Sequence, residues 1–167
     1  MGLSLSDEEA ITLTEKLPWD VKQEVLWIVR GYDRRVKLFK ELRSDILNGG
    51  GENYVTYKVK NEERRAYLPG GGSDGRGVER KEEQLAGLEQ LPEVRKMRAV
   101  EYALGRVGLD ITNSELRQKL RDGIMLNCKN RYGSPFEQLG LVGISQKSFY
   151  RRRDVFLLDI AKFLQIL

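Results

Sequence analysis

Apolar residues recur at intervals of three and four along most of the chain, the spacing of an amphipathic α-helix. The longest such pattern starts after Pro18 and runs to Ile46, with only Arg35 out of place. Its apolar positions are Val21, Val25, Ile28, Tyr32, Phe39, Leu42 and Ile46. Because proline suits the first turn of a helix, we predict one long helix over this stretch. A capping box at Ser6–Glu9 predicts a shorter helix before it, ending near residue 16.

The apolar seam of the long helix has two interpretations. In one, the seam packs inside its own domain; in the other, Val21–Ile46 forms the contact of a homodimer. The spacing fits both equally, so the sequence leaves the oligomeric state open.

Glycines interrupt the helical pattern after Asn48. Residues 49–78 contain eight glycines and one proline, a composition typical of a flexible linker. Within this stretch Tyr54–Val59 alternates weakly between apolar and polar residues, and Arg65–Leu68 is a candidate returning strand. We therefore expect a linker that contains at most a β-hairpin.

Helical patterning returns at Glu79 and continues to the end of the chain. Pro92 is expected to open one helix and a capping box at Thr112–Glu115 another. The positions expected to face inward are Leu85, Leu88, Leu91, Val94, Met97, Val100, Ala103, Leu104, Val107, Leu116, Leu120, Ile124 and Cys128. The sequence thus predicts a mainly all-α protein in three segments: an N-terminal helical part over 1–48, a linker over 49–78 and a helical bundle over 79–167.

The last segment contains the pattern of a helix-turn-helix at 134–153. Pro135 starts a short helix, and Gly143 stands where the turn needs a residue that accepts positive φ. Ile144 is expected to fill the space between the two helices, and Ser145 to cap the second one. That second helix is predicted to run from Gln146 to Leu167.

The first turns of this second helix carry the chemistry of DNA recognition. In a helix-turn-helix these turns enter the major groove, where Gln reads adenine and Lys or Arg reads guanine. Consecutive arginines spread around the helix, so at least one of them is expected to contact phosphates. The candidate DNA-binding residues are Ser145, Gln146, Lys147, Tyr150, Arg151, Arg152 and Arg153. The alternative is an ordinary helical hairpin with an arginine-rich exposed edge.

Charge is distributed unevenly along the chain. The whole chain has a net charge of +4, yet residues 113–167 alone hold ten basic and five acidic residues, a net charge of +5. A basic C-terminal third on a nearly neutral body is typical of a module that binds a polyanion.

Other residue types limit the function classes. Histidine is absent, which removes the commonest general base and most transition-metal sites, and we expect no enzymatic activity, metal or cofactor. The single cysteine, Cys128, excludes an internal disulfide and points to a reducing cytoplasm. The sequence shows neither a membrane-spanning segment nor a signal peptide.

The chain resembles the RinA/ArpU-like family of phage transcriptional regulators, whose helix-turn-helix is similar to sigma region 4. The resemblance lies in Ile28–Arg35, Met97–Leu104 and, most sharply, Gly143–Arg153. It implies a prophage or phage activator of late genes that binds promoter DNA in the bacterial cytoplasm. Residues 49–78 depart from the family pattern, which leaves open how the N-terminal part relates to the DNA-binding end.

Two further questions remain open from the sequence. One is whether the protein contacts RNA polymerase directly. The other is whether it is a regulator or, alternatively, the small terminase subunit of a DNA-packaging machine, which would also combine a helix-turn-helix with a self-associating helical part.

Overall fold

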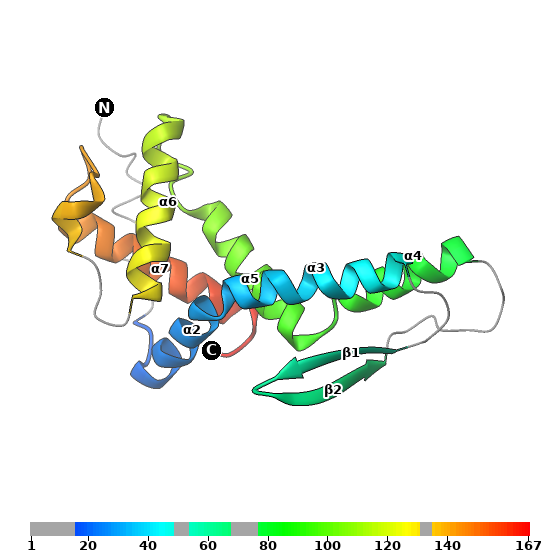
Figure 1. Ribbon diagram of the computed structural model, residues 1–167. Coiled ribbons are helices and arrows are strands. Elements are labelled where there is room, and N and C mark those ends of the chain that lie inside the picture. Colours follow the sequence, from blue (N-terminus) through cyan, green and yellow to red (C-terminus); the bar gives the residue numbers. More distant parts are fainter. Residues whose placement is uncertain (1–15, 49–53, 68–76, 131–134) are drawn as a thin grey trace. The chain divides into compact units, whose positions relative to one another are not determined.

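The protein is mainly helical and contains one two-stranded antiparallel sheet (Figure 1). The structure is a computed structural model, and it describes residues 16–48, 54–67, 77–130 and 135–167. None of the helices in these ranges combines the length and the apolar character needed to cross a bilayer. The short helix predicted over 6–16 lies outside the described residues, apart from Lys16.

The described residues form two compact units, one of residues 16–31 with those from 98 onward and the other of those between 32 and 97. This division follows contacts in space, whereas the predicted segments 1–48, 49–78 and 79–167 followed composition. The N-terminal and C-terminal helices therefore share one unit, although they are far apart in the sequence.

The first unit consists of helices packed around an apolar core. Helix α2 (Trp19–Arg30) packs on α6 (Ser114–Lys129) and on α7 (Gln146–Phe163), and α6 also packs on α7 (Figure 1). Val25 and Val29 of α2 are fully buried in this unit, as are Leu120 of α6 and Phe156 of α7. The unit also contains the C-terminal part of α5 (Pro92–Arg106) and the 3₁₀ helix η1 (Phe136–Leu139).

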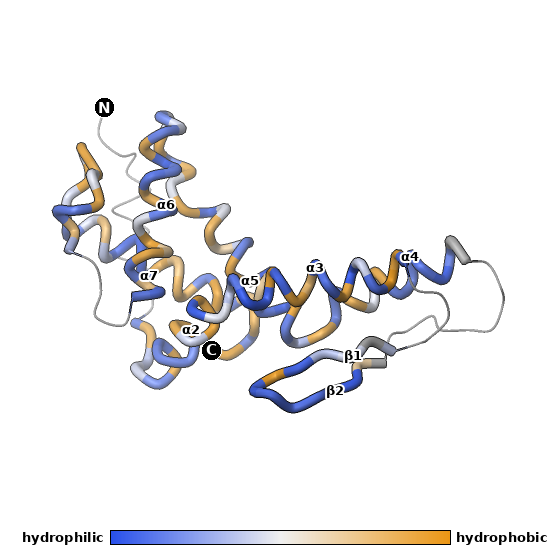
Figure 2. The backbone as a smooth tube through the Cα atoms, viewed as in Figure 1, coloured by the Kyte–Doolittle hydropathy of each residue, from blue (hydrophilic) through white to orange (hydrophobic). Residues whose placement is uncertain are grey.

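The second unit pairs helices with the hairpin. Helix α3 (Tyr32–Asn48) packs against α4 (Gly77–Leu88) and against strand β1 (Tyr54–Val59). The buried cluster is Leu42, Ile46, Leu88, Leu91, Val94 and Met97, with α5 contributing its first turns. Strand β2 (Glu62–Tyr67) is largely hydrophilic, as Figure 2 shows.

The prediction of one long helix after Pro18 is wrong. The chain leaves helical geometry at Gly31, where φ is −85° and ψ is 2°, so that α2 ends at Arg30 and α3 begins at Tyr32. Glycine costs about 1 kcal/mol relative to alanine inside a helix, which makes this the weakest point of the pattern. The apolar seam is divided accordingly, with Ile28 buried in the first unit and Leu42 in the second.

Arg35, the exception in the apolar pattern, is a buried ion-paired residue. Its Nε donates to Glu93 Oε2 at 2.9 Å, and the Arg35 side chain is only 8% exposed. Burial on its own would raise the pKa of Glu93, but the hydrogen bond from Arg35 and the charges of Arg35, Lys96 and Arg34 together outweigh it and lower that pKa. The pair links α3 to α5 inside the second unit.

The hairpin predicted within residues 49–78 is present. Strand β1 has the predicted bounds, whereas its partner covers Glu62–Tyr67 and therefore starts three residues before the predicted Arg65. Lys60 and Asn61 connect the strands with positive φ at both positions, 52° and 64°, as a two-residue type I′ turn requires. The usual Asn-Gly sequence of such turns is absent, so the turn itself was not predicted.

Two helix ends differ from their predictions. Helix α6 is capped by Asn113 rather than Thr112, and the Asn113 side chain accepts from the backbone N–H groups of Glu115 and Leu116. Helix α7 stops at Phe163 instead of Leu167. A Schellman motif ends it, with Gln165 at positive φ and the Ile166 N–H bonded to the Ala161 carbonyl oxygen.

Candidate nucleic-acid interface

The segment from Pro135 to the start of α7 has part of the predicted geometry. Gly143 has a φ of 89°, Ile144 is buried, and the Ser145 side chain accepts from the Ser148 N–H as the N-cap of α7. The first helix, however, is the four-residue 3₁₀ helix η1, and Pro135 stands at its N-cap instead of its first position. A helix-turn-helix is therefore not confirmed, and residue 134 of the predicted 134–153 motif lies outside the described residues.

Helix α7 is anchored to the first unit by Phe149. This side chain is fully buried and contacts the Phe136 ring of η1, with ring centroids 5.6 Å apart. Gly123 of α6 lies beside this contact, where a Cβ would meet Phe149 at 3.6 Å and Leu139 at 3.5 Å, both ordinary van der Waals distances. Phe149 thus fixes which side of the first turns of α7 faces inward.

The opposite side of these turns is polar and accessible. Ser145, Gln146 and Lys147 are exposed and Arg151 is half-buried. Lys147 and Arg151 are four residues apart and so lie on the same face of the helix. Neither side chain forms an ion pair with a described residue.

The N-terminus of α7 adds to this positive character. No acidic residue lies in its first turn, and the Ser145 side chain satisfies the N–H of Ser148 only. Within the described part of the chain, the backbone N–H groups of Gln146 and Lys147 have no hydrogen-bond acceptor. Open N–H groups at the positive end of a helix dipole are suited to binding an anion.

Arg152, one of the predicted DNA-binding residues, is instead part of the interior. Its side chain is 7% exposed and forms two hydrogen bonds to Asp110, from Nη1 to Oδ1 at 3.0 Å and from Nη2 to Oδ2 at 2.8 Å. Hydrogen bonding from Arg152 lowers the pKa of Asp110, against the opposing effect of burial. Of the seven candidates, Arg152 is the one that is buried, and the fold uses its guanidinium in an internal ion pair.

Arg153 and Tyr150 are partly engaged within the protein. Arg153 donates from Nη1 to Asn127 Oδ1 at 3.1 Å and from Nη2 to Asp154 Oδ1 at 3.2 Å. Its guanidinium carbon lies 4.9 Å from the centre of the Tyr150 ring, a cation–π distance. With its side chain 20% exposed, Arg153 is less accessible than Lys147.

The sequence did not indicate the partners of Arg152 and Arg153. Asp110 and Asn127 gave no signal, because a carboxylate in a loop and an asparagine in a helix are common on any surface. Arg121 was counted toward the basic end, yet it donates to the backbone carbonyl oxygens of Val107 and Gly105. Asp110, which pairs with Arg152, lies outside residues 113–167, so the net charge of that segment overstates the charge that an external polyanion would meet.

The described residues form neither a cluster of metal ligands nor a reactive thiol. In the described ranges, no three acidic or cysteine side chains gather as metal ligands would. Burial raises the pKa of the Cys128 thiol to about 12, so the thiol stays protonated at neutral pH. Cys128 is consequently a small apolar core residue.

Comparison of the chain with models of known protein families, with curated proteins and with solved structures finds no match. The resemblance to the RinA/ArpU-like phage regulators thus stays a prediction from the residues alone.

Proposed function

We propose that the protein is a sequence-specific, double-stranded DNA-binding transcriptional regulator that uses the first turns of α7. The observation that carries this proposal is the exposed face formed by Lys147 and Arg151 beside the open N-terminus of α7. These two cations have no ion-pair partner among the described residues, so binding a polyanion would not first require breaking an ion pair there.

Phosphate binding would use the charged and backbone groups together. The N–H groups of Gln146 and Lys147 would face one phosphate, and the Lys147 and Arg151 side chains would neutralise neighbouring ones. Arg153 would contribute less, because two of its donors are occupied by Asn127 and Asp154. Such contacts fix the register of the helix on DNA without selecting a sequence.

Sequence selection would come from Gln146, together with Lys147 or Arg151. The amide of Gln146 matches the donor and acceptor of adenine in the major groove, and a lysine or arginine matches guanine. Each good pair of this kind is worth about 1 to 3 kcal/mol against the wrong base. Ser145 and Tyr150 would lie beside the major groove of the DNA. Ser145 is exposed there, and the ring of Tyr150 is half-buried.

The test is selection of bound duplexes from a random DNA pool with the full chain, followed by affinity measurements on the recovered sequence. We expect an enriched sequence, and we expect Lys147→Ala and Arg151→Ala each to weaken binding to it. Lys162→Ala is the matched control, since Lys162 is exposed near the other end of α7, about 22 Å along the helix from Lys147.

Two outcomes would contradict the proposal. One is a pool without an enriched sequence; the other is equal weakening of binding by Lys147→Ala and by Lys162→Ala.

The mass of the particle on DNA separates the packaging alternative, because a closed ring of many subunits would favour a terminase component over a regulator.

A further inference from the structure

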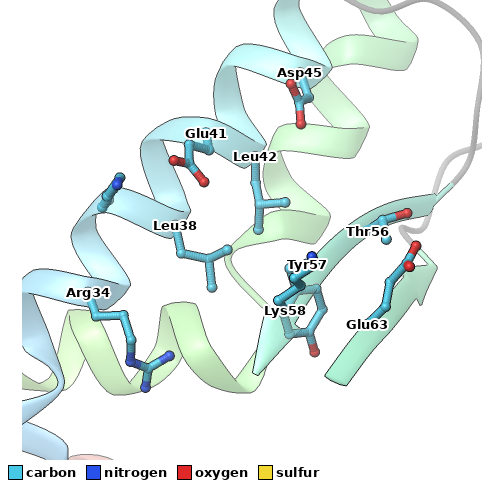
Figure 3. A pocket seen from close by; sticks show the side chains of 10 residues that line it. Arg34, Leu38, Glu41, Leu42, Asp45, Thr56, Tyr57, Lys58 and Glu63 are labelled. Carbon is cyan, nitrogen blue, oxygen red and sulfur yellow. The ribbon is translucent and has the colours of Figure 1, made fainter. Parts of the chain in front are cut away.

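The second unit has a groove between α3 and the hairpin that is lined by charged residues of both signs (Figure 3). Its volume is about 450 Å³, and it is lined by three basic and three acidic side chains around Leu38, Leu42 and Tyr57. The charged residues are Arg34, Lys37, Lys58, Glu41, Asp45 and Glu63. A small ion of either sign would meet like charges here, so the groove suits a partner that carries both signs.

The α3 charges that line the groove are sorted by sign along the helix. Arg34 and Lys37 lie toward its N-terminus, while Glu41 and Asp45 lie toward its C-terminus, and all four are exposed (Figure 3 labels all but Lys37). Of these four, Arg34 in the first turn and Asp45 in the last turn oppose the helix dipole, which favours acids at the N-terminus and bases at the C-terminus. Glu41 and Asp45 also repel each other at a spacing of four residues.

These charges are poorly compensated within the chain. Lys37, Glu41 and Asp45 form no ion pair with any residue that the structure describes. Arg34 has one long contact, 3.7 Å from its Nη2 to Glu93 Oε2, with 52% of its side chain exposed. An arrangement that is unfavourable inside one helix indicates compensation from outside.

We propose that a second copy of this chain supplies that compensation, through antiparallel packing of α3 against α3 of its partner. Antiparallel packing places Lys37 opposite the partner's Glu41 and Arg34 opposite the partner's Asp45. The midpoints of these two pairs, positions 39 and 39.5, nearly coincide, so one two-fold axis near Phe39 forms both pairs twice.

The same arrangement compensates the helix dipoles and buries apolar surface. Two antiparallel helices bring the positive end of one dipole beside the negative end of the other. Half-buried Leu38, between the two charge pairs, would lie close to the axis and contact the partner. This dimer is distinct from the one predicted through the apolar seam, because Leu42 and Ile46 of that seam are buried in the core of the second unit.

The test uses single charge reversals and the mass of the full chain without DNA, so it does not depend on the proposed function. We expect wild-type protein to form a reversible dimer of twice 19.2 kDa in analytical ultracentrifugation. Lys37→Glu replaces two attractions per dimer by two repulsions, and Glu41→Lys does the same. Each should raise the dissociation constant about tenfold or more.

Mixing provides the decisive comparison. Lys37→Glu protein and Glu41→Lys protein should each be mainly monomeric, yet an equimolar mixture should dimerise, because in the mixed dimer one pair has exchanged signs, the other has its natural signs, and both attract. The double variant Lys37→Glu/Glu41→Lys should dimerise with itself for the same reason. Lys40→Glu, an exposed neighbour that does not line the groove, is the matched control and should leave the mass unchanged.

Three results would overturn the proposal. The first is a wild-type chain that stays monomeric over the whole concentration series. The second is dimerisation of either single variant as strongly as wild type. The third is a mixture that stays monomeric although circular dichroism shows both variants folded. If a single variant loses its helical signal, the double variant decides, and a folded monomer of it contradicts the proposed pairing.

Discussion

The ion pair between Arg152 and Asp110 gives the clearest prediction about stability. Arg152→Met keeps the unbranched apolar stem of the side chain but removes both hydrogen bonds to Asp110, together with the one from Arg152 Nε to Ser148 Oγ at 3.3 Å. Asp110 is then left with a charge whose partner is gone, in a site where its side chain is 17% exposed.

The expected loss follows from the burial of the two groups. Removing one member of a fully buried ion pair costs about 3 to 5 kcal/mol, because the other charge stays buried without compensation. Since Asp110 is partly exposed and gains some hydration, we expect Arg152→Met to lower the free energy of unfolding by about 2 to 4 kcal/mol. That is a large share of the 5 to 15 kcal/mol typical of a folded domain.

Urea unfolding at neutral and at acid pH measures this loss. The pKa of Asp110 is lowered in the folded state, so its contribution is fully present above the ordinary value of 3.8 and is lost as the pH falls through the lowered pKa. The difference between wild type and Arg152→Met should therefore shrink in acid. In the background of Asp110→Asn, the same arginine substitution should cost less than it does alone.

A different pattern would refute this reasoning. Arg152→Met would then have the same urea midpoint as wild type but would bind DNA as weakly as Lys147→Ala. In that case Arg152 acts on the outside of the protein, and its assignment to a buried ion pair is wrong.

Three further predictions concern glycines and the cysteine. Gly143→Ala should destabilise the protein by about 1 kcal/mol, because alanine is strained at a φ of 89°; a gain in the urea midpoint would contradict this. Gly123→Ala should instead stabilise it by about 0.5 to 1 kcal/mol, since the new Cβ meets Leu139 and Phe149 only at 3.5 Å or more and alanine favours the helix; a loss above 1 kcal/mol would show that the contact is tighter. The buried thiol of Cys128 should react with a disulfide reagent only after unfolding in urea, and rapid reaction of the native protein at pH 8 would oppose its burial.

Periodicity predicted the helices of this protein well where burial follows the apolar pattern. The stripe on α6 is an example, with Leu120, Ile124 and Cys128 all buried as expected. The apolar pattern did not predict the end of α2 at Gly31, where a single residue leaves helical geometry. The apolar seam continues across this break because both helices keep the same spacing. The end of α7 was missed for a related reason, since a Schellman motif with glutamine at the positive-φ position has no sequence signal.

The candidate site was only partly predictable, because a sequence does not show which cations are used internally. Three consecutive arginines looked alike, yet Arg152 is buried against Asp110, Arg153 is half engaged with Asn127, and Arg151 has no ion-pair partner among the described residues. Asp110 lies 42 residues before Arg152, and Asn127 lies 26 residues before Arg153. Long-range pairs of this kind depend on the fold and leave no local pattern.

The salt dependence of DNA binding tests the central claim most directly. Fluorescence anisotropy on the selected duplex over a series of salt concentrations should show affinity falling linearly on logarithmic axes. Arg151→Ala should reduce the slope by about 1 if Arg151 neutralises one phosphate, and Lys162→Ala should leave the slope unchanged. An affinity that does not respond to salt, or equal slopes for wild type and Arg151→Ala, would contradict a DNA interface at the start of α7.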